Sequence, residues 1–327
     1  MQFVSITGPK ADIDRVVDQY ISRYEIHLEN ALAQLQTLKT LTPYLQINPY
    51  KGLLAKALEY AYDDWCISVL AGALDDEANR DKYAAFAEGY KVYFDPSTRF
   101  MRGLDSEGNW RTPFNPRASN HRNDDYCEGT AWQWTWFVPH DVDGLVELMG
   151  GRDAFIGKLD SLFTADSKLE GESTSVDISG LIGQYAHGNE PSHHIAHLYN
   201  YVGQPWRTQE IVDEVLHTLY FNNPDGLSGN EDCGQMSAWY ILNAMGFYQV
   251  CPGKPVYSIG RPLFNEATVH LKDGKSFKVI AHNNSRDNKY VRSIVLNGNK
   301  LETPFFTHQD IVDGGTLELT MGSEPLK

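Results

Sequence analysis

Hydrophobic positions recur every three or four residues through most of the first 246 residues, which is the period of an amphipathic helix. Between residues 11 and 41, for example, Ile13, Val17, Tyr20 and Tyr24 fall on one helical face. This pattern predicts one long helix or two there, and further helices over residues 51–74, 81–93, 131–148, 153–163, 193–202, 208–220 and 235–246.

The pattern changes after Pro252, where short β-branched runs are bounded by Gly, Asn and Asp. These runs predict antiparallel strands at residues 267–271, 277–280, 294–296 and 317–319. Helices followed by strands predict a mainly α chain with a small antiparallel β unit. We therefore expect three parts: a helical N-terminal segment (1–50), a larger helical part (51–252) and a β-strand unit (253–327).

Three long loops rich in Gly, Asn, Asp and Pro interrupt the helices, at residues 95–125, 164–191 and 222–234. Long loops inside a helical array usually form or cover a binding site. We therefore expect the chemistry of the protein in these loops.

Composition narrows the classes of partner. The formal net charge of −15 argues against nucleic acid, because binding a phosphate backbone requires clustered Lys and Arg. The chain lacks an apolar stretch of the roughly 18 residues that a membrane span needs, and the start Met1-Gln2-Phe3-Val4 does not resemble a secretory signal. The 18 Tyr, 14 Phe and 7 Trp can bind the faces of sugars, although aromatic residues also build ordinary cores.

Carboxylates stand just before a predicted helix in three separate segments. Each one can be a helix cap or a partner of the helix dipole. Glycosidases, however, need one protonated and one ionised carboxyl group, and Ca²⁺ needs several oxygen ligands. Together the segments supply both sets: Asp124-Asp125-Tyr126-Cys127-Glu128-Gly129-Thr130, Gly188-Asn189-Glu190-Pro191-Ser192-His193-His194 and Gly229-Asn230-Glu231-Asp232-Cys233-Gly234-Gln235.

The run His193-His194-x-x-His197 offers a zinc alternative, since His193 and His197 share a helical face. The Glu of an HExxH metalloprotease is absent, and the oxygen donors nearby favour a hard cation. The four cysteines include no CxxC pair, and motifs for nucleophilic serine, phosphate-loop or dinucleotide chemistry are missing.

Five motifs, in their order along residues 53–325, resemble those of the α-mannosidases of glycoside hydrolase family 92. They are Leu-Glu-Tyr-Ala-Tyr-Asp-Asp-Trp (58–65), Phe-Asp-Pro-Ser-Thr-Arg-Phe-Met-Arg-Gly (94–103), Tyr-Cys-Glu-Gly-Thr-Ala-Trp-Gln-Trp (126–134), Gly-Asn-Glu-Pro-Ser-His-His (188–194) and Gly-Asn-Glu-Asp-Cys-Gly-Gln-Met-Ser-Ala-Trp-Tyr (229–240).

The resemblance implies that residues 51–252 are the catalytic part and form part of an (α/α)6 helical barrel, which packs against a β-sandwich, whereas residues 1–50 carry no motif of the family. It also implies removal of α-linked mannose, commonly α-1,2-linked, from N-glycans or mannan with inversion. Glu128 matches the general acid and Asp232 the general base, while Asn230 stands where some members carry a second acidic residue. In an inverting glycosidase, acid and base lie roughly 6.5–9.5 Å apart.

The resemblance further implies a Ca²⁺ site on Asn189, Glu190 and Asp232. It places Trp132, Trp134, His193, His194 and Glu231 beside the sugar, whereas Trp65 and Trp239 are expected in the core.

Members of this family are generally much longer than this chain. The helical barrel would therefore be incomplete, and we expect an oligomer or a complementing N-terminal chain. The resemblance implies a periplasmic or extracellular location. The alternative is a catalytically inert fragment that only binds calcium or carbohydrate.

Overall fold

The computed structural model describes residues 53–121 and 125–326, apart from the side chains of residues 53 and 273. The chain divides into one unit of Met1–Tyr50 with Asp105–Asn109 and a second of Lys51–Leu104 with Trp110–Lys327. The described part of the first unit is a turn closed by the Asp105 carboxylate, which accepts the N–H groups of Glu107 and Asn109 at 2.9 Å. The predicted helical segment at residues 1–50 lies outside the described residues, and the fold below is that of the second unit.

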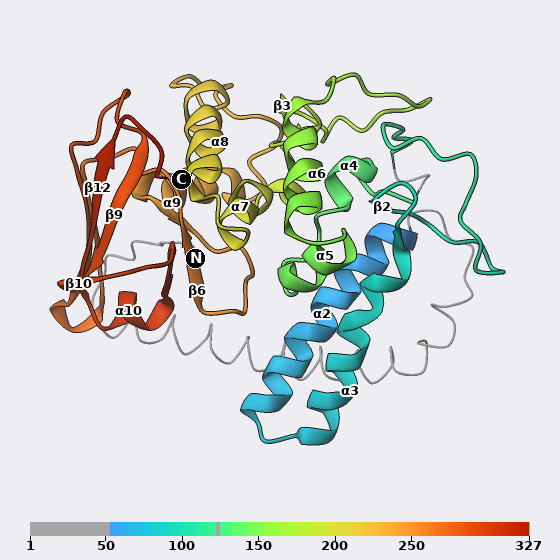
Figure 1. Ribbon diagram of the computed structural model, residues 1–327, viewed down its shortest axis with the longest axis horizontal. Coiled ribbons are helices and arrows are strands. Elements are labelled where there is room, and N and C mark those ends of the chain that lie inside the picture. Colours follow the sequence, from blue (N-terminus) through green and yellow to red (C-terminus); the bar gives the residue numbers. More distant parts are fainter. Residues whose placement is uncertain (1–52, 122–124, 327) are drawn as a thin grey trace, which may run out of the picture. The chain divides into compact units, whose positions relative to one another are not determined.

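The helical part opens with a hairpin in which α2 (Leu53–Ala73) and α3 (Glu77–Ala87) lie side by side (Figure 1). Asp76 caps α3, because its carboxylate accepts the N–H of Asn79 at 3.1 Å. The helices that follow are α4 (Ala131–Trp134), α5 (Val142–Leu148), α6 (Arg152–Thr164), α7 (Leu198–Tyr201), α8 (Pro205–Thr218), α9 (Gln235–Met245) and α10 (His308–Val312). Turns of 3-10 helix occur at Glu88–Tyr93, Glu190–Ser192, Ile195–His197 and Lys272–Gly274.

The helices predicted at residues 51–74, 153–163, 208–220 and 235–246 are confirmed by α2, α6, α8 and α9. The prediction of one helix over 131–148 is wrong, because the helical conformation ends after Trp134 and resumes at Val142. Pro139 lies in the gap, and proline cannot supply a helical N–H. Asp141 then starts α5 by accepting the N–H of Gly144 at 2.9 Å.

The β unit contains a five-stranded sheet in the order β10-β9-β12-β8-β7. Its strands are β7 (Glu266–His270), β8 (Ser276–His282), β9 (Tyr290–Leu296), β10 (Asn299–Lys300) and β12 (Gly315–Gly322). Neighbours are antiparallel, as predicted, except that β8 and β12 are parallel, with Leu317 opposite Val279. The sheet is therefore mixed, which requires the long crossover between β8 and β12.

Shorter strands pair elsewhere. A three-stranded sheet has the order β11-β6-β5 and is formed by β5 (Phe247–Tyr248), β6 (Val256–Ile259) and β11 (Phe305–Thr307). Two-stranded pairs join β1 (Phe94–Asp95) to β2 (Phe100–Met101) and β3 (Leu181–Ile182) to β4 (Tyr185–Ala186). The sequence pattern predicted none of these pairs, because each strand is only two to four residues long.

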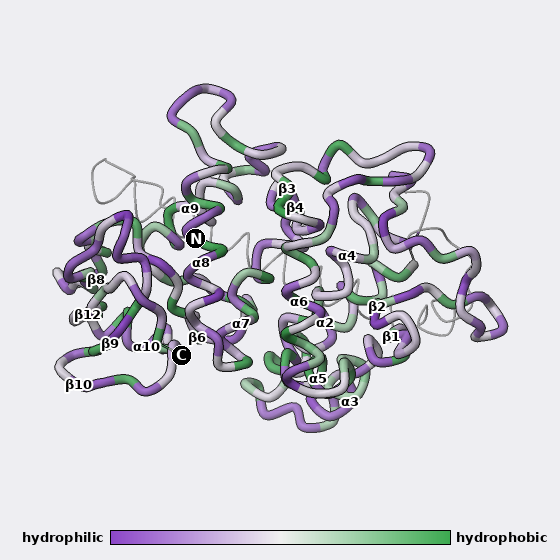
Figure 2. The backbone as a smooth tube through the Cα atoms, turned by 45° about the horizontal axis from the view of Figure 1, so that its top comes forward, coloured by the Kyte–Doolittle hydropathy of each residue, from purple (hydrophilic) through white to green (hydrophobic). Residues whose placement is uncertain are grey.

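Two apolar clusters hold the unit together. The helical cluster includes the fully buried Trp136 and Trp239, and the cluster of the β unit is built around Phe277, Leu317 and Leu319. Buried and partly exposed residues alternate along β12. Figure 2 shows that hydrophilic and hydrophobic stretches follow one another along the whole described chain. Helix α8 joins the two parts, because it contacts both α9 and β9 and because the Gln209 amide oxygen accepts the N–H of Val291 at 3.1 Å.

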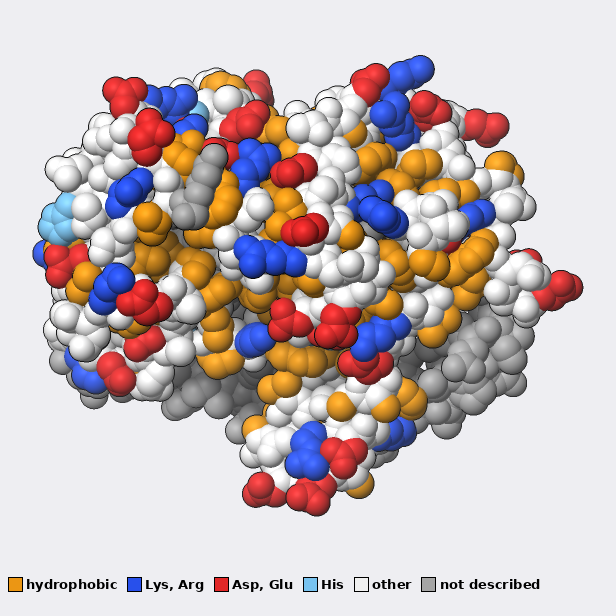
Figure 3. Space-filling view, in the orientation of Figure 1, with side chains coloured by type: hydrophobic (Ala, Val, Ile, Leu, Met, Phe, Trp, Pro, Cys, Tyr) orange, Lys and Arg blue, Asp and Glu red, His pale blue; other side chains and the backbone are white. Residues whose placement is uncertain are grey.

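On the face drawn in Figure 3, charged side chains of both signs are interspersed with apolar patches. The α2–α3 hairpin contributes apolar surface, since Leu74 is 70% exposed and Val69, Leu70 and Phe86 are also exposed. Within residues 53–121 and 125–326, every helix is too short or too polar to cross a membrane.

The β-unit cluster yields a stability prediction. Leu319→Ala should lower the free energy of unfolding by about 2–5 kcal/mol, because Leu319 is fully buried and its truncation leaves a cavity. Glu318→Ala is the control, since the partly exposed Glu318 side chain bonds the exposed His282 at the surface and its loss should cost less than about 1 kcal/mol. Urea unfolding followed by circular dichroism measures both changes. Equal losses would show that the two side chains do not face opposite sides of β12.

Helix α2 yields a pH prediction. Burial, followed by the charge of Asp63, raises the pKa of Asp64 to about 7, with a smaller opposing effect of Lys82. The folded state then keeps this proton at pH values where the unfolded state has released it. Stability should consequently fall as the pH rises from about 4 to about 7. Asp64→Asn should flatten that part of the profile and the exposed Asp81→Asn should not, as read from thermal melting midpoints; an unchanged Asp64→Asn profile would contradict the raised pKa.

Candidate active site

Glu128 lies in the turn before α4 and has a left-handed backbone conformation, with φ of 52°. The turn is fixed by a capping box in which the Gln133 side chain accepts from the Thr130 N–H at 2.7 Å. Left-handed conformations of non-glycine residues are uncommon and often occur at functional sites. In this turn the Glu128 side chain is half-buried.

Asp232 has the same unusual backbone conformation in the turn before α9. Asp232, Cys233 and Gly234 are left-handed in succession, with φ of 49°, 58° and 96°. The Asp232 carbonyl accepts the N–H of Gln235, the first residue of α9, at 3.2 Å. The Asp232 side chain is exposed at the N-terminal end of this helix.

Asn189 and Glu190 form the third part of the site. The Asn189 amide nitrogen donates to the Glu128 carbonyl at 2.9 Å, and its amide oxygen accepts from the Glu190 N–H at 3.1 Å. Asn189 therefore ties the loop of Glu190 to the loop of Glu128, which precedes it by 61 residues.

The carboxyl groups of the three loops lie close together. Although the Glu190 side chain is exposed, burial of its carboxyl raises the pKa, and a hydrogen bond with Asp232 raises it further. The charges of Asp232 and Glu128 act in the same direction. The structure thus brings together Glu128, Glu190 and Asp232, three residues that the sequence predicted for one site.

Glu59 on α2 is a neighbour of this cluster that the sequence did not predict for the site. Burial raises the pKa of Glu59, and the charges of Asp63 and Glu128 add to the effect. A signal was present, because Glu59 belongs to the motif at residues 58–65. Glu59 therefore lies near Glu128 at the edge of this cluster.

Trp132 lies on α4 near Glu128 and is half-buried by protein groups. The Phe100 ring packs edge-on at 4.9 Å between ring centroids, and the Lys158 amine lies 4.6 Å above the indole. Burial, helped by the charge of Arg99, lowers the pKa of Lys158 to about 7. Contact between Trp132 and a sugar stays a prediction.

Trp134 and His194 are enclosed by protein. The Trp134 indole N–H donates to the Cys127 carbonyl at 2.8 Å, and His194 Nε2 bonds the Trp136 carbonyl at 2.7 Å. Burial lowers the pKa of His194 to about 4. Both residues thus bond backbone carbonyl groups, and their predicted contact with sugar stays untested.

His193 and His197 use both ring nitrogens for protein contacts. His193 bonds the His187 carbonyl at 3.0 Å and Gln235 at 3.2 Å, while His197 bonds Ser258 at 3.0 Å and Asn243 at 2.8 Å. A zinc ion would have to replace these bonds, so the zinc alternative loses support.

Glu231 and Asn230 precede Asp232 in the same loop. The Glu231 carboxylate accepts the N–H and the hydroxyl of Ser237, both at 2.9 Å, and thereby caps the first turn of α9. Asn230 is exposed. Both residues lie next to Asp232 in the chain, and their predicted roles toward substrate stay predictions.

The predicted calcium ligands are Asn189, Glu190 and Asp232, and Ca²⁺ requires six to eight oxygen ligands. Among the described residues, groups of three or more His, Cys, Asp or Glu with metal-binding geometry are absent. Glu190 and Asp232 nevertheless share a hydrogen bond, and Asn189 lies next to Glu190. Two adjacent carboxyl groups and an amide are hard oxygen donors, so the set fits Ca²⁺ if carbonyls and water complete the six to eight ligands.

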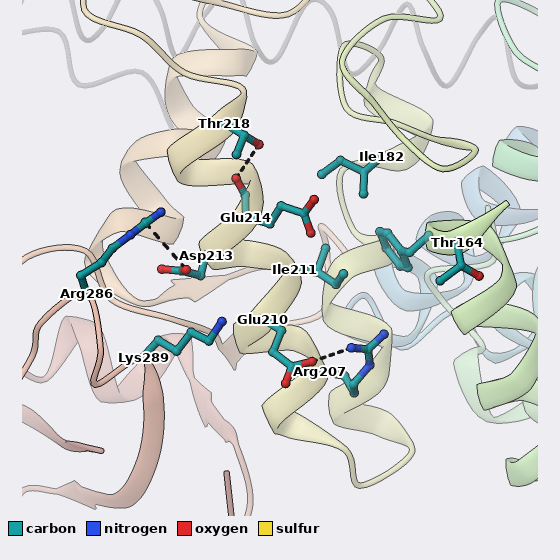
Figure 4. A pocket seen from close by; sticks show the side chains of 11 residues that line it. Thr164, Ile182, Arg207, Glu210, Ile211, Asp213, Glu214, Thr218, Arg286 and Lys289 are labelled. Atoms are coloured by element: carbon teal, nitrogen blue, oxygen red, sulfur yellow. Dashed lines mark hydrogen bonds and ion pairs between the residues drawn. The ribbon is translucent and has the colours of Figure 1, made fainter. Parts of the chain in front are cut away.

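A pocket of about 520 Å³ lies away from these residues, between α6, α8 and the segment before β9 (Figure 4). Two ion pairs lie in its wall, in which Arg207 is bonded to Glu210 and Arg286 lies 3.8 Å from Asp213. None of its lining residues belongs to the predicted site.

Comparison with known proteins identifies the family of this chain. Residues 16–323 match the model of the glycosyl hydrolase family 92 catalytic domain. A secreted glycosidase of Arthroderma benhamiae, itself uncharacterized, is 28% identical over 294 residues, which are 83% of this chain and 36% of that protein.

Solved structures agree with this match. A family GH92 α-mannosidase of Bacteroides thetaiotaomicron in complex with mannoimidazole is 43% identical, with a TM-score of 0.79 over 84% of this chain and 36% of that chain. A family GH92 inverting mannosidase of the same bacterium is 42% identical, with a TM-score of 0.74 over 83% of this chain and 37% of that chain. The chain thus spans little more than a third of the length of these relatives.

The cap formed by Glu231 yields a prediction. Glu231→Ala should lower the free energy of unfolding by about 1 kcal/mol, because the N–H and hydroxyl of Ser237 lose their acceptor. The exposed Glu214→Ala on α8 is the matched control and should change little. Denaturant midpoints of the two variants give the comparison, and equal midpoints would exclude a capping role.

Proposed function

This chain belongs to glycoside hydrolase family 92, and from that premise we propose that it carries the catalytic site of an exo-acting α-mannosidase. The substrate we propose is α-linked mannose, α-1,2-linked in the first instance, at the ends of N-glycans or mannan. The observation that carries the proposal is the meeting of Glu128, Glu190 and Asp232 from three distant loops. The mannosidases among its structural relatives support the choice of sugar.

We assign the two steps of proton transfer to two carboxyl groups. Glu128 donates a proton to the leaving glycosidic oxygen as that bond breaks. Asp232 removes a proton from the water that attacks the opposite face of the sugar, so the product has inverted configuration. The turns that hold both residues in left-handed conformations support this assignment, because they fix the direction of each side chain.

We propose that Asn189, Glu190 and Asp232 hold a Ca²⁺ ion. Glu190 supports this, since its pKa is raised in part by Asp232, and a divalent cation would remove that repulsion between carboxylates. When bound, the ion supplies positive charge that orients sugar hydroxyls and water. Asn189 would also keep its bond to the Glu128 carbonyl and so align the acid with the ion site.

The chain spans 36% of the length of its curated relative, so hydrolysis of mannosides by this chain is itself a proposal. The exposed apolar residues of the α2–α3 hairpin support a partner chain or an oligomer that covers them. The secreted relative supports a periplasmic or extracellular location. The competing function is an inert chain that binds calcium or carbohydrate without hydrolysis.

The test is release of mannose from α-1,2-mannobiose by the purified chain, with Ca²⁺ and with a chelator. Glu128→Gln and Asp232→Asn should each lower the rate by about 10²–10⁴-fold, because each removes one step of acid–base catalysis. Glu214→Gln, on the exposed face of α8, should leave the rate unchanged. Proton NMR of the first turnover should show β-mannose as the initial product.

The outcomes separate the two functions. Calcium-dependent release that both variants abolish would establish the mannosidase. A folded chain that binds mannobiose or Ca²⁺ without hydrolysis, with or without the remaining part of a relative supplied as a second chain, would establish the inert alternative.

A further inference from the structure

The His193 ring is a buried link between two loops of the site. The residue is only 2% exposed, and it is bonded from both sides. His193 Nε2 lies 3.0 Å from the His187 carbonyl oxygen, and Nδ1 lies 3.2 Å from the amide nitrogen of Gln235. The His193 carbonyl also accepts the indole N–H of Trp239 at 2.9 Å.

The partners determine where the ring proton lies. A backbone carbonyl can only accept, so Nε2 must carry the hydrogen. The amide nitrogen of Gln235 can only donate, so Nδ1 must be unprotonated. The ring is therefore neutral, in the Nε2–H form.

The two partners of His193 belong to the segments that carry Glu190 and Asp232. His187 precedes Glu190 by three residues, and the His193 N–H itself donates to the Glu190 carbonyl at 3.0 Å. Gln235 is the first residue of α9, and its N–H donates to the Asp232 carbonyl at 3.2 Å. The ring thus spans the gap between the two loops.

The His187 side of the link is itself immobilised. His187 Nδ1 bonds the Tyr185 hydroxyl at 2.8 Å, and Nε2 bonds the Tyr220 hydroxyl at 2.7 Å. The Trp239 ring packs edge-on against His187 at 4.3 Å between centroids. The His187 carbonyl is therefore a fixed point, whereas Asp232 lies in an exposed turn that depends on α9.

We infer that His193 is a positioning residue, which holds the loop of Glu190 and the first turn of α9 at a fixed separation through its neutral, Nε2-protonated ring. This inference rests on the proposed function for its catalytic consequence, because Asp232 and Glu190 are there the base and the ion ligands. Its structural content, the link between the two loops, does not depend on hydrolysis.

Two variants remove the bond between His193 and Gln235, each by changing one of the two partners. In His193→Gln the new amide can still donate to the His187 carbonyl, but the bond to Gln235 is lost. Gln235→Leu removes the same bond and leaves the buried ring in place, which covers the case in which His193→Gln does not fold. His282→Gln, an exposed histidine of the β unit, is the matched control.

Hydrogen–deuterium exchange over residues 229–235 is the first measurement. Both variants should speed exchange of this segment roughly tenfold, because each removes the bond between His193 and Gln235. Gln235→Leu also removes the bond between Gln235 and Tyr248, so the double variant should exchange no faster than Gln235→Leu alone. In ¹⁵N-histidine NMR, the signal that disappears in His193→Gln should show a protonated Nε2 and a bare Nδ1.

Kinetics connect the link to the reaction. If the chain or its complemented form is active, kcat should fall roughly 10–100-fold in both variants while KM changes less, as expected for displaced support of a metal site. Hydrogen exchange and NMR detect the bond between His193 and Gln235 even in a chain that releases no mannose. Failure of the proposed function can therefore be distinguished from failure of this inference. Unchanged exchange in both variants, or a protonated Nδ1, would overturn the inference.

Discussion

The close approach of carboxyl groups is the constraint on which the site depends. Glu190 shares a hydrogen bond with Asp232, with Glu128 near enough to raise its pKa further. Like charges at such distances repel, so the protein must hold each loop by other bonds. The bond between Asn189 and the Glu128 carbonyl and the bonds of His193 supply that restraint.

Backbone turns and the first turns of helices supply most of this restraint. Glu128 and Asp232 both have left-handed backbone conformations, and each turn leads directly into a helix. The first turns of those helices are capped by Gln133 with Thr130 and by Glu231. Capping therefore stabilises more than the helix ends, because it also fixes the direction in which the carboxyl groups point.

Behind this layer lies a set of buried histidines and aromatic rings. His187, His193, His194 and His197 each bond protein groups, and burial lowers the pKa of all four. Neutral imidazole can donate and accept at once, which lets one ring join two segments. Helix α8 attaches the β unit to the helical part. The β unit has an apolar cluster of its own around Phe277 and Leu319.

The sequence by itself determined the mainly α chain with a terminal β unit, most of the long helices, and the three loops that supply Glu128, Glu190 and Asp232, because hydrophobic period and motif order are local properties. Only the tertiary structure decided how residues far apart in the chain combine. It made the sheet mixed by pairing β8 with β12, it broke the helix expected over 131–148, and it buried Trp134, His193 and His194 among protein groups. Burial and strand direction depend on packing between distant segments, and a local pattern of residues carries no record of which segments meet.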